Sequence, residues 1–170
     1  TWDARKEETA TEMFAHVEGK IGPIDICIFN VGGNVHFPIL ETTERVFRKV
    51  WEMCAYAAFL SGREAAKYMV ERQKGSIFFT GATASVRGSL GYAAFASGKF
   101  ALRGLAQSMA RELGPRNIHV AHLIIDAGVN TEFVRDRLRQ AGTNPDHLLS
   151  DTLMSPDSIA EAYWNLHHQR

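Results

Sequence analysis

The segment SIFFTGA, residues 76–82, lies at the centre of a pattern that predicts the fold. Its residues are apolar, aromatic or small, and Gly75 precedes it. Two similar runs occur along the chain, IDICIFN (24–30) and IHVAHLII (118–125), each bounded by Gly, Pro or Asn. Short apolar runs that are rich in β-branched and aromatic residues are typical of strands buried on both faces. Because such strands belong to parallel sheets, the sequence predicts a parallel sheet built on these three strands.

Helical patterns fill the segments between and after these strands. The predicted helices cover residues 11–20, 43–73 and 92–113, and a last helix opens at residue 155. Thr42 or Thr43 can cap the second helix, and Gly75 follows its end. Ser155 can cap the last helix, with Pro156 in its first position.

The alternation of strands and helices predicts right-handed crossovers, with helices on both faces of the sheet. We therefore expect an α/β protein with a Rossmann-like, doubly wound parallel sheet, forming one domain over residues 1–170. Residues 141–154 form the one long irregular stretch in this prediction, and long loops near strand ends often act as lids. This stretch is the candidate substrate loop.

Composition excludes several classes of partner and site. The 170 residues include 19 basic and 19 acidic side chains, which argues against nucleic acid or an anionic membrane as a partner. No apolar run approaches the roughly 18 residues of a membrane span, and no secretory signal opens the chain. Cys27 and Cys54 are expected to be reduced core thiols of a cytoplasmic protein. His119 and His122 should point to opposite faces of a strand, so no metal site is predicted.

Glycine-containing motifs follow each of the three predicted strands. They are Asn30-Val31-Gly32-Gly33-Asn34, Thr80-Gly81-Ala82-Thr83-Ala84-Ser85 and Asp126-Ala127-Gly128-Val129-Asn130-Thr131. Parallel sheets bind ligands beyond the carboxyl ends of their strands, and glycine lets the backbone approach a ligand closely. Each motif taken alone is also explained by ordinary turn chemistry.

In their order and spacing these motifs resemble the short-chain dehydrogenase/reductase family. Asn30-Val31-Gly32 resembles the family's N-A-G, Phe95 to Lys99 resembles its Y-x-x-x-K, and Ala127 to Thr131 is similar to its P-G-x-x-x-T. The run from Ala101 to Pro115 is also close to the family pattern. The resemblance implies an oxidoreductase that uses NAD or NADP on a small carbonyl or alcohol substrate. The cofactor-binding positions that it implies are Asp3, Asn30, Val31, Gly32, Lys99, Ala127, Gly128 and Thr131.

The chain departs from the family at its start, where no Gly-rich turn for the cofactor pyrophosphate is found. Asp3 matches the acidic residue that lies beside the adenine in the family. The resemblance therefore implies a partial fold, without the N-terminal βα units and the last strand. We expect that the natural protein is longer, or that another chain covers the sheet edge.

A second departure concerns the catalytic positions. The family's tyrosine, lysine, serine and asparagine correspond to Phe95, Lys99, Ala82 and Cys54. Phenylalanine has no hydrogen-bond donor or acceptor, so the usual proton route is absent. Lys99 is either a ribose ligand or a lysine whose ammonium reaches solvent.

Nearby hydroxyl groups are the candidate replacements. They are those of Tyr92, Thr83 and Ser85, with local packing and backbone hydrogen bonds as the alternative explanation of each. Two functions stay open: an oxidoreductase with an atypical active site, and a degenerate relative that acts as a nucleotide-binding or regulatory subunit. By resemblance, a homodimer or homotetramer would form through helices 43–73 and 92–113.

Overall fold

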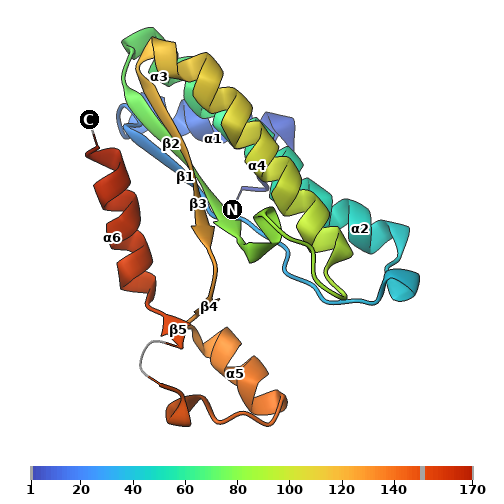
Figure 1. The fold of residues 1–170 in the computed structure, drawn as a ribbon. Coiled ribbons are helices and arrows are strands. Elements are labelled where there is room, and N and C mark those ends of the chain that lie inside the picture. Colours follow the sequence, from blue (N-terminus) through green and yellow to red (C-terminus); the bar gives the residue numbers. More distant parts are fainter. Residues whose placement is uncertain (1, 150–151, 170) are drawn as a thin grey trace. The chain divides into compact units, whose positions relative to one another are not determined.

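The computed structural model describes residues 2–149 and 152–169, and the chain divides into two compact units, Thr1–Ile125 and Asp126–Arg170 (Figure 1). None of the described helices combines the length and apolar character needed to cross a bilayer.

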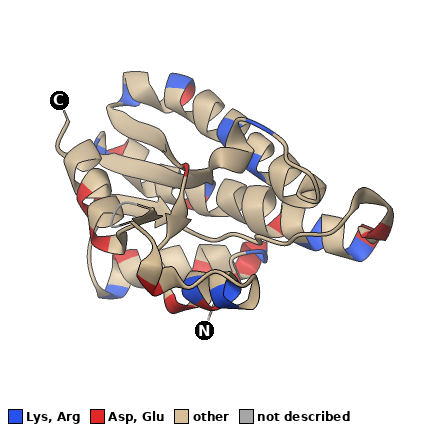
Figure 2. Ribbon diagram, turned by 60° about the horizontal axis from the view of Figure 1, so that its bottom comes forward, with Lys and Arg blue, Asp and Glu red and all other residues tan. Residues whose placement is uncertain are grey.

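The first unit is built on a three-stranded parallel sheet in the order β1-β2-β3. The strands are β1 (Ile26–Phe29), β2 (Gly75–Ala82) and β3 (Ile118–Ile125), and none of them carries a charged residue (Figure 2). All three predicted strands are confirmed, although β1 is shorter than residues 24–30. One reason is that the amide of Ile24 donates its hydrogen bond to the Glu18 carboxylate (3.0 Å) and not to a strand.

The helices of this unit follow the predicted ranges with local differences. They are α1 (Glu7–Lys20), α2 (Glu44–Trp51), a π-helical segment (Glu52–Tyr56), α3 (Ala57–Arg72) and α4 (Ala93–Leu113). α1 begins at Glu7 and not at residue 11, and the acidic Glu7 and Glu8 in its first turn favour that start. The predicted helix 43–73 is continuous but contains the π-helical segment. Thr43 caps it by accepting a hydrogen bond from the Val46 amide (3.2 Å).

Gly75 follows the end of this helix, as predicted, but it does not form the helix cap. Gln73 takes the left-handed conformation at the helix end, with φ of 51°. Gly75, with φ of 154°, opens β2 instead, and a Cβ there would overlap the side chain of Met69. The glycine is needed for close packing against α3 and not for the cap.

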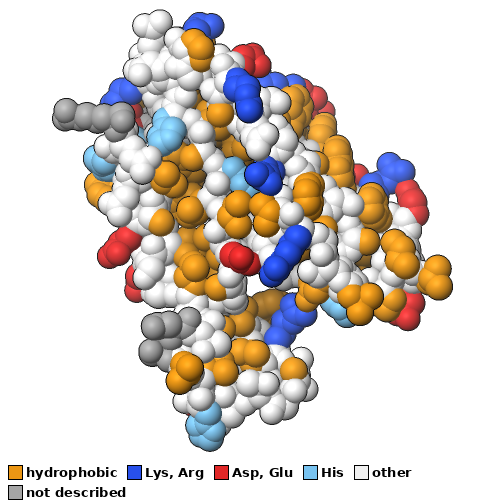
Figure 3. All heavy atoms as spheres, viewed as in Figure 1, with side chains coloured by type: hydrophobic (Ala, Val, Ile, Leu, Met, Phe, Trp, Pro, Cys, Tyr) orange, Lys and Arg blue, Asp and Glu red, His pale blue; other side chains and the backbone are white. Residues whose placement is uncertain are grey.

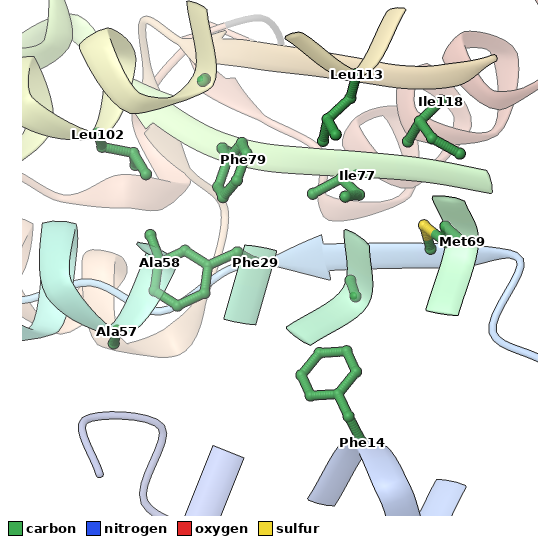
Figure 4. Packing of buried hydrophobic residues seen from close by; sticks show 12 residues of the cluster. Phe14, Phe29, Ala57, Ala58, Met69, Ile77, Phe79, Leu102, Leu113 and Ile118 are labelled. Carbon is green, nitrogen blue, oxygen red and sulfur yellow. The ribbon is translucent and has the colours of Figure 1, made fainter. Parts of the chain in front are cut away.

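The main core lies between one face of the sheet and three helices (Figure 4). Because alternate strand residues share a face, Phe29, Ile77, Phe79 and Ile118 point to the same side of the sheet. The helical members of this cluster include Phe14 of α1, Ala57, Ala58 and Met69 of α3, and Leu102 and Leu113 of α4. Burial of this apolar surface fixes α4 against the sheet and so positions its N-terminal turns near the carboxyl ends of the strands.

Among its described residues the second unit contains a two-stranded parallel sheet and two helices, of which the sequence pattern predicted only the last helix. β4 (Gly128–Val129) pairs in parallel with β5 (Leu153–Met154), and α5 (Glu132–Gln140) and α6 (Pro156–His167) are its helices. The predicted start of α6 is confirmed, since the Ser155 side chain accepts a hydrogen bond from the Asp157 amide (3.2 Å).

The predicted irregular stretch 141–154 holds β5 and a short 3-10 turn at Pro145–His147. Residues 150 and 151 lie outside the described residues. The substrate-loop role of this stretch stays a prediction.

Candidate active site

Lys99 is a buried cation near the carboxyl end of β2. It lies on α4 with only 4% of its surface exposed, and its Nζ donates a hydrogen bond to the Thr80 carbonyl oxygen (2.7 Å). The alternative in which its ammonium reaches solvent is therefore wrong. The packing of α4 against the sheet draws this side chain inward.

Phe95 lies one helical turn before Lys99, and its ring centroid is 5.8 Å from the Lys99 Nζ. Phe95 belongs to a small apolar cluster with Val50, Cys54 and Ala94, against which Ala82 and Tyr92 pack. The four catalytic positions implied by the family resemblance thus come together. Phe95, Cys54 and Ala82 share one cluster, and Lys99 places its ammonium over the Phe95 ring. What differs is the chemistry, since the cluster is apolar.

Burial controls the ionisation of the two polar members of this group. Desolvation lowers the pKa of Lys99, and the nearby Cys54 partly opposes this shift. Desolvation also raises the pKa of the Cys54 thiol, against smaller effects of the Lys99 charge and a hydrogen bond from the Gly33 amide. Both cysteines are free, as predicted. A thiol with a raised pKa is a poor nucleophile, which favours a packing role for Cys54.

The loop after β1 lies directly against the Lys99 ammonium. A Cβ added at Gly32 would lie 3.7 Å from Nζ, so the backbone of the N-A-G-like motif flanks the lysine. Asp3 and Val31 line a neighbouring cavity of about 530 Å³, together with Trp2, Ala4, Arg5, Lys49 and Met53. Hydrogen bonds from Arg5 hold the pKa of Asp3 at about 2. Asn30, the first residue of the motif, is exposed.

Ser85 is fully buried, and its hydroxyl is already engaged. Its Oγ accepts a hydrogen bond from the Ala82 amide (3.1 Å) and lies 3.3 Å from Nε2 of His122. Burial first, and then the charges of Lys99 and Arg103, lower the pKa of His122 to about 4. A neutral His122 can accept the Ser85 proton in a hydrogen bond. Of the two explanations of Ser85, a replacement catalytic hydroxyl or a hydrogen bond to the local backbone, the second therefore describes its geometry.

The pattern of the sequence did not reveal this contact of His122. The predicted opposite orientations are confirmed, because His119 packs edge-on against Phe78 with ring centroids 5.3 Å apart. No group suited to a metal ion occurs among the described residues. The side chain of His122 occupies the space that a Cβ at Gly81 would need. These two residues are brought together only by the register of β2 and β3.

Tyr92 and Thr83 are placed near the cluster at the ends of two elements. Tyr92 precedes the first residue of α4, and its ring meets the His36 ring edge-on at 4.9 Å. Thr83 begins the 3-10 turn Thr83–Ser85 after β2. The roles of both as proton donors stay predictions.

The remaining predicted cofactor positions belong to the second unit. Ala127 precedes β4, Gly128 lies in it, and Thr131 caps α5 by accepting a hydrogen bond from the Val134 amide (3.4 Å). Their role at the cofactor stays a prediction.

Comparison with known proteins agrees with the family resemblance. The family model described as short chain dehydrogenase matches residues 1–142. The chain belongs to the short-chain dehydrogenase/reductase family. Its α/β, Rossmann-like fold with a parallel sheet is that of the family's solved structures, as the sequence predicted.

Individual relatives support this assignment. A short-chain dehydrogenase from Rhodopseudomonas palustris is 54% identical, with a TM-score of 0.72 over 90% of this chain and 70% of that one. Short chain aldehyde dehydrogenase 1 of Euphorbia lathyris is 30% identical over 85% of this chain and 50% of its own length. A Tyr-to-Phe variant of ElxO with NADPH bound shares the fold, with a TM-score of 0.89 at 20% identity, over 98% of this chain and 69% of that one. The chain spans about a third to a half of the length of the curated relatives it matches.

Proposed function

We propose that this short-chain dehydrogenase/reductase chain contributes Lys99 to the active site of an NAD(P)-dependent oxidoreductase. In this site a group other than the usual tyrosine transfers the proton. The observation that supports this best is the Lys99 ammonium, which is buried next to Gly32. Among the described residues it pairs with no carboxylate. A buried cation without an acidic partner has donor capacity left for a ligand hydroxyl.

The residues present fit a dinucleotide cofactor. Lys99 would hold ribose hydroxyls beside the Gly32 backbone, and Asp3 with Val31 would line the adenine side. When bound, NAD(P) supplies or accepts the hydride. The ElxO variant shows that a Tyr-to-Phe change in another protein of this fold is compatible with bound NADPH.

The proton of the substrate oxygen needs another carrier than Phe95. Neither Phe95 nor Ala82 can donate or accept a proton, and the Ser85 hydroxyl already has two partners. Tyr92 is the preferred candidate, because it packs against the same cluster as Phe95. Thr83 or water is the next choice. We propose a small carbonyl or alcohol as substrate, which is the substrate class that the family resemblance implies.

The test is titration of the full-length protein with NADH and NADPH by nicotinamide fluorescence, followed by turnover with a panel of carbonyls. We expect binding and slow turnover, and loss of turnover in Tyr92→Phe. The double variant Phe95→Tyr with Ala82→Ser should be faster, because it restores the missing proton and hydrogen-bond donors. If the wild type and the double variant both bind the cofactor but only the double variant turns over, the result would instead support a function as a nucleotide-binding or regulatory subunit. Absence of cofactor binding would refute the proposal.

We also propose that the chain pairs with a second copy through helices 43–73 and 92–113. Trp51 and Phe59 are each 40% exposed and Phe100 is 45% exposed, and apolar side chains follow α4 on the face in Figure 3. Tyr68, in contrast, packs against its own core. Light scattering should give the mass of a dimer or tetramer, and a monomer would remove this proposal. The free cysteines support a reducing, cytoplasmic location.

A further inference from the structure

A second cavity lies between the loop after β1 and the helix α2. Its volume is about 400 Å³, which is within the range of small-molecule sites. Loop residues form one wall, and α2 with the π-helical segment after it forms the other. The described residues that line the cavity are Gly32, Gly33, Asn34, Val35, Phe37, Val46, Lys49, Val50 and Met53. Lys99 and Phe95 are not among them, so this cavity is separate from the catalytic positions.

The apolar walls of this cavity are held in place by contacts of their own. Val35 and Val46 pack against the cluster that contains Phe95. The Phe37 amide donates a hydrogen bond to the Gly91 carbonyl oxygen (2.8 Å), which fixes the path of the loop. An apolar chain can therefore bury its surface here at little cost in ordering the protein.

Lys49 supplies the charge at this cavity. Its side chain is exposed and, within the described part of the chain, forms no ion pair. Its neighbour Arg48, in contrast, pairs with Glu44 (2.6 Å). No carboxylate is among the described lining residues, and Asn34 adds an amide that can donate a hydrogen bond. The lining thus combines apolar walls with one positive charge that no neighbour balances.

We propose that this cavity binds a short-chain carboxylate, with its alkyl group against Val46 and Phe37 and its carboxylate at Lys49. One ammonium balances one negative charge, whereas a phosphate group carries about two. Because Gly32 lines the cavity and also flanks Lys99, a bound carboxylate would stabilise the loop beside the proposed cofactor site. Binding of the carboxylate itself does not require the cofactor.

Hexanoate is the probe, and hexanol is the matched ligand that has the same chain length without the charge. Each is titrated into the full-length protein with isotope-labelled valine and methionine methyl groups, and binding is followed by NMR. We expect saturable shifts of the Val46 and Met53 methyl signals, and none at Val70, which packs against the main core. Each methylene removed from the carboxylate, as in pentanoate, should weaken binding about fourfold, the value of a buried methylene group.

Lys49→Met tests the charge. This variant should bind hexanoate about threefold to fivefold more weakly, as expected for an exposed ion pair, and should bind hexanol as the wild type does. Arg48→Met is the matched control, because it removes the neighbouring positive charge, which lies outside the lining. It should change the affinity for neither ligand.

Gly33→Ala tests the apolar space. Its Cβ would lie 3.6 Å from the Met53 sulfur and from Cγ2 of Val50, in ordinary contact with two lining residues. The added methyl group should weaken both ligands by about fourfold, because it takes the space of one methylene. A Lys49→Met protein that binds hexanoate as tightly as the wild type would overturn the proposal. So would shifts that leave out Val46 and Met53, or a Gly33→Ala protein with both affinities unchanged.

Discussion

The two ends of β2 have opposite surroundings. At the amino end and middle of the strand, Ile77 and Phe79 are fully buried among apolar side chains of α3 and α4. At the carboxyl end, the backbone from Thr80 to Ala82 bonds to Lys99 and to Ser85. Apolar burial stabilises the first region, whereas the second buries polar groups at a cost in stability. Local departures of this kind are expected where a protein binds or reacts.

The largest effect is expected for lysines at these two ends. Lys99→Met removes the buried ammonium, and we expect NADPH affinity to fall by about 10- to 100-fold, the value of hydrogen bonds from a charged donor. Lys74→Met at the amino end is the matched control. Lys74 is 69% exposed and pairs with Asp25 at the surface (3.1 Å), so its loss should leave the affinity unchanged. Equal losses in fluorescence titration would remove the difference between the two ends.

The next effect concerns two glycines that face these regions. A Cβ at Gly98 would lie 2.8 Å from the Cβ of Cys54, an atom fixed close to the backbone. A Cβ at Gly62 would meet the flexible end of Met109 and the Phe79 ring, each at 3.0 Å.

We expect Gly98→Ala to lower the free energy of unfolding by about 2 kcal/mol and Gly62→Ala by less than about 1 kcal/mol, since an overpacked site is costly where neighbours cannot move. Urea denaturation measures both. Gly19→Ala in α1, with open space around it, should be neutral or stabilising. A larger loss for Gly62→Ala than for Gly98→Ala would contradict the view that the carboxyl end is the more tightly constrained.

The core end of the sheet was predictable from sequence because its signals are local. The predicted bounds agree with the observed ones to within one residue for the strands predicted at 76–82 and 118–125 and for the helix predicted at 92–113. Periodicity and glycine or proline boundaries are enough where one face of each element is simply apolar.

The site end was predictable only through the resemblance to a family. The spacing of Phe95 and Lys99 showed that they share a helix face, but not that Lys99 bonds to Thr80 or that Gly32 lies against it. Those contacts depend on strand register and loop path, which no local pattern encodes. The contact between Ser85 and His122 was missed for the same reason, since 36 residues separate them along the chain. The helix α5 was missed because its residues are mostly polar.

A smaller effect is expected from two serines with different surroundings. Ser85→Ala leaves the partly buried amide of Ala82 without its partner, which should cost about 1–2 kcal/mol of the free energy of unfolding. Ser97→Ala removes only an exposed hydroxyl that donates to the Ala93 carbonyl (2.8 Å), and the expected change is within about 0.5 kcal/mol. Equal values for the two variants in urea denaturation would show that the Ser85 bond does not stabilise the carboxyl end.

The smallest effect is a pH dependence that should come from the carboxyl end. The pKa of His122 is about 4 in the folded chain, below the ordinary value of 6.5. Between these pH values the unfolded chain binds a proton that the folded chain does not, so stability is complete above pH 6.5 and decreases as the pH falls toward 4. Because the ring is only partly buried, we expect a loss of about 1 kcal/mol from this group, well below the full linkage value.

His122→Gln tests this, because glutamine can still accept the Ser85 hydrogen bond but does not titrate. The variant should lose about 1 kcal/mol less than the wild type when urea denaturation is repeated at pH 6.5 and at pH 4.5. His119→Gln changes the histidine on the opposite face of the same strand and should keep the wild-type slope. If both variants retained that slope, His122 beside Ser85 could not be the source of the acid sensitivity. The contrast between the two ends of β2 would then rest on Lys99 alone.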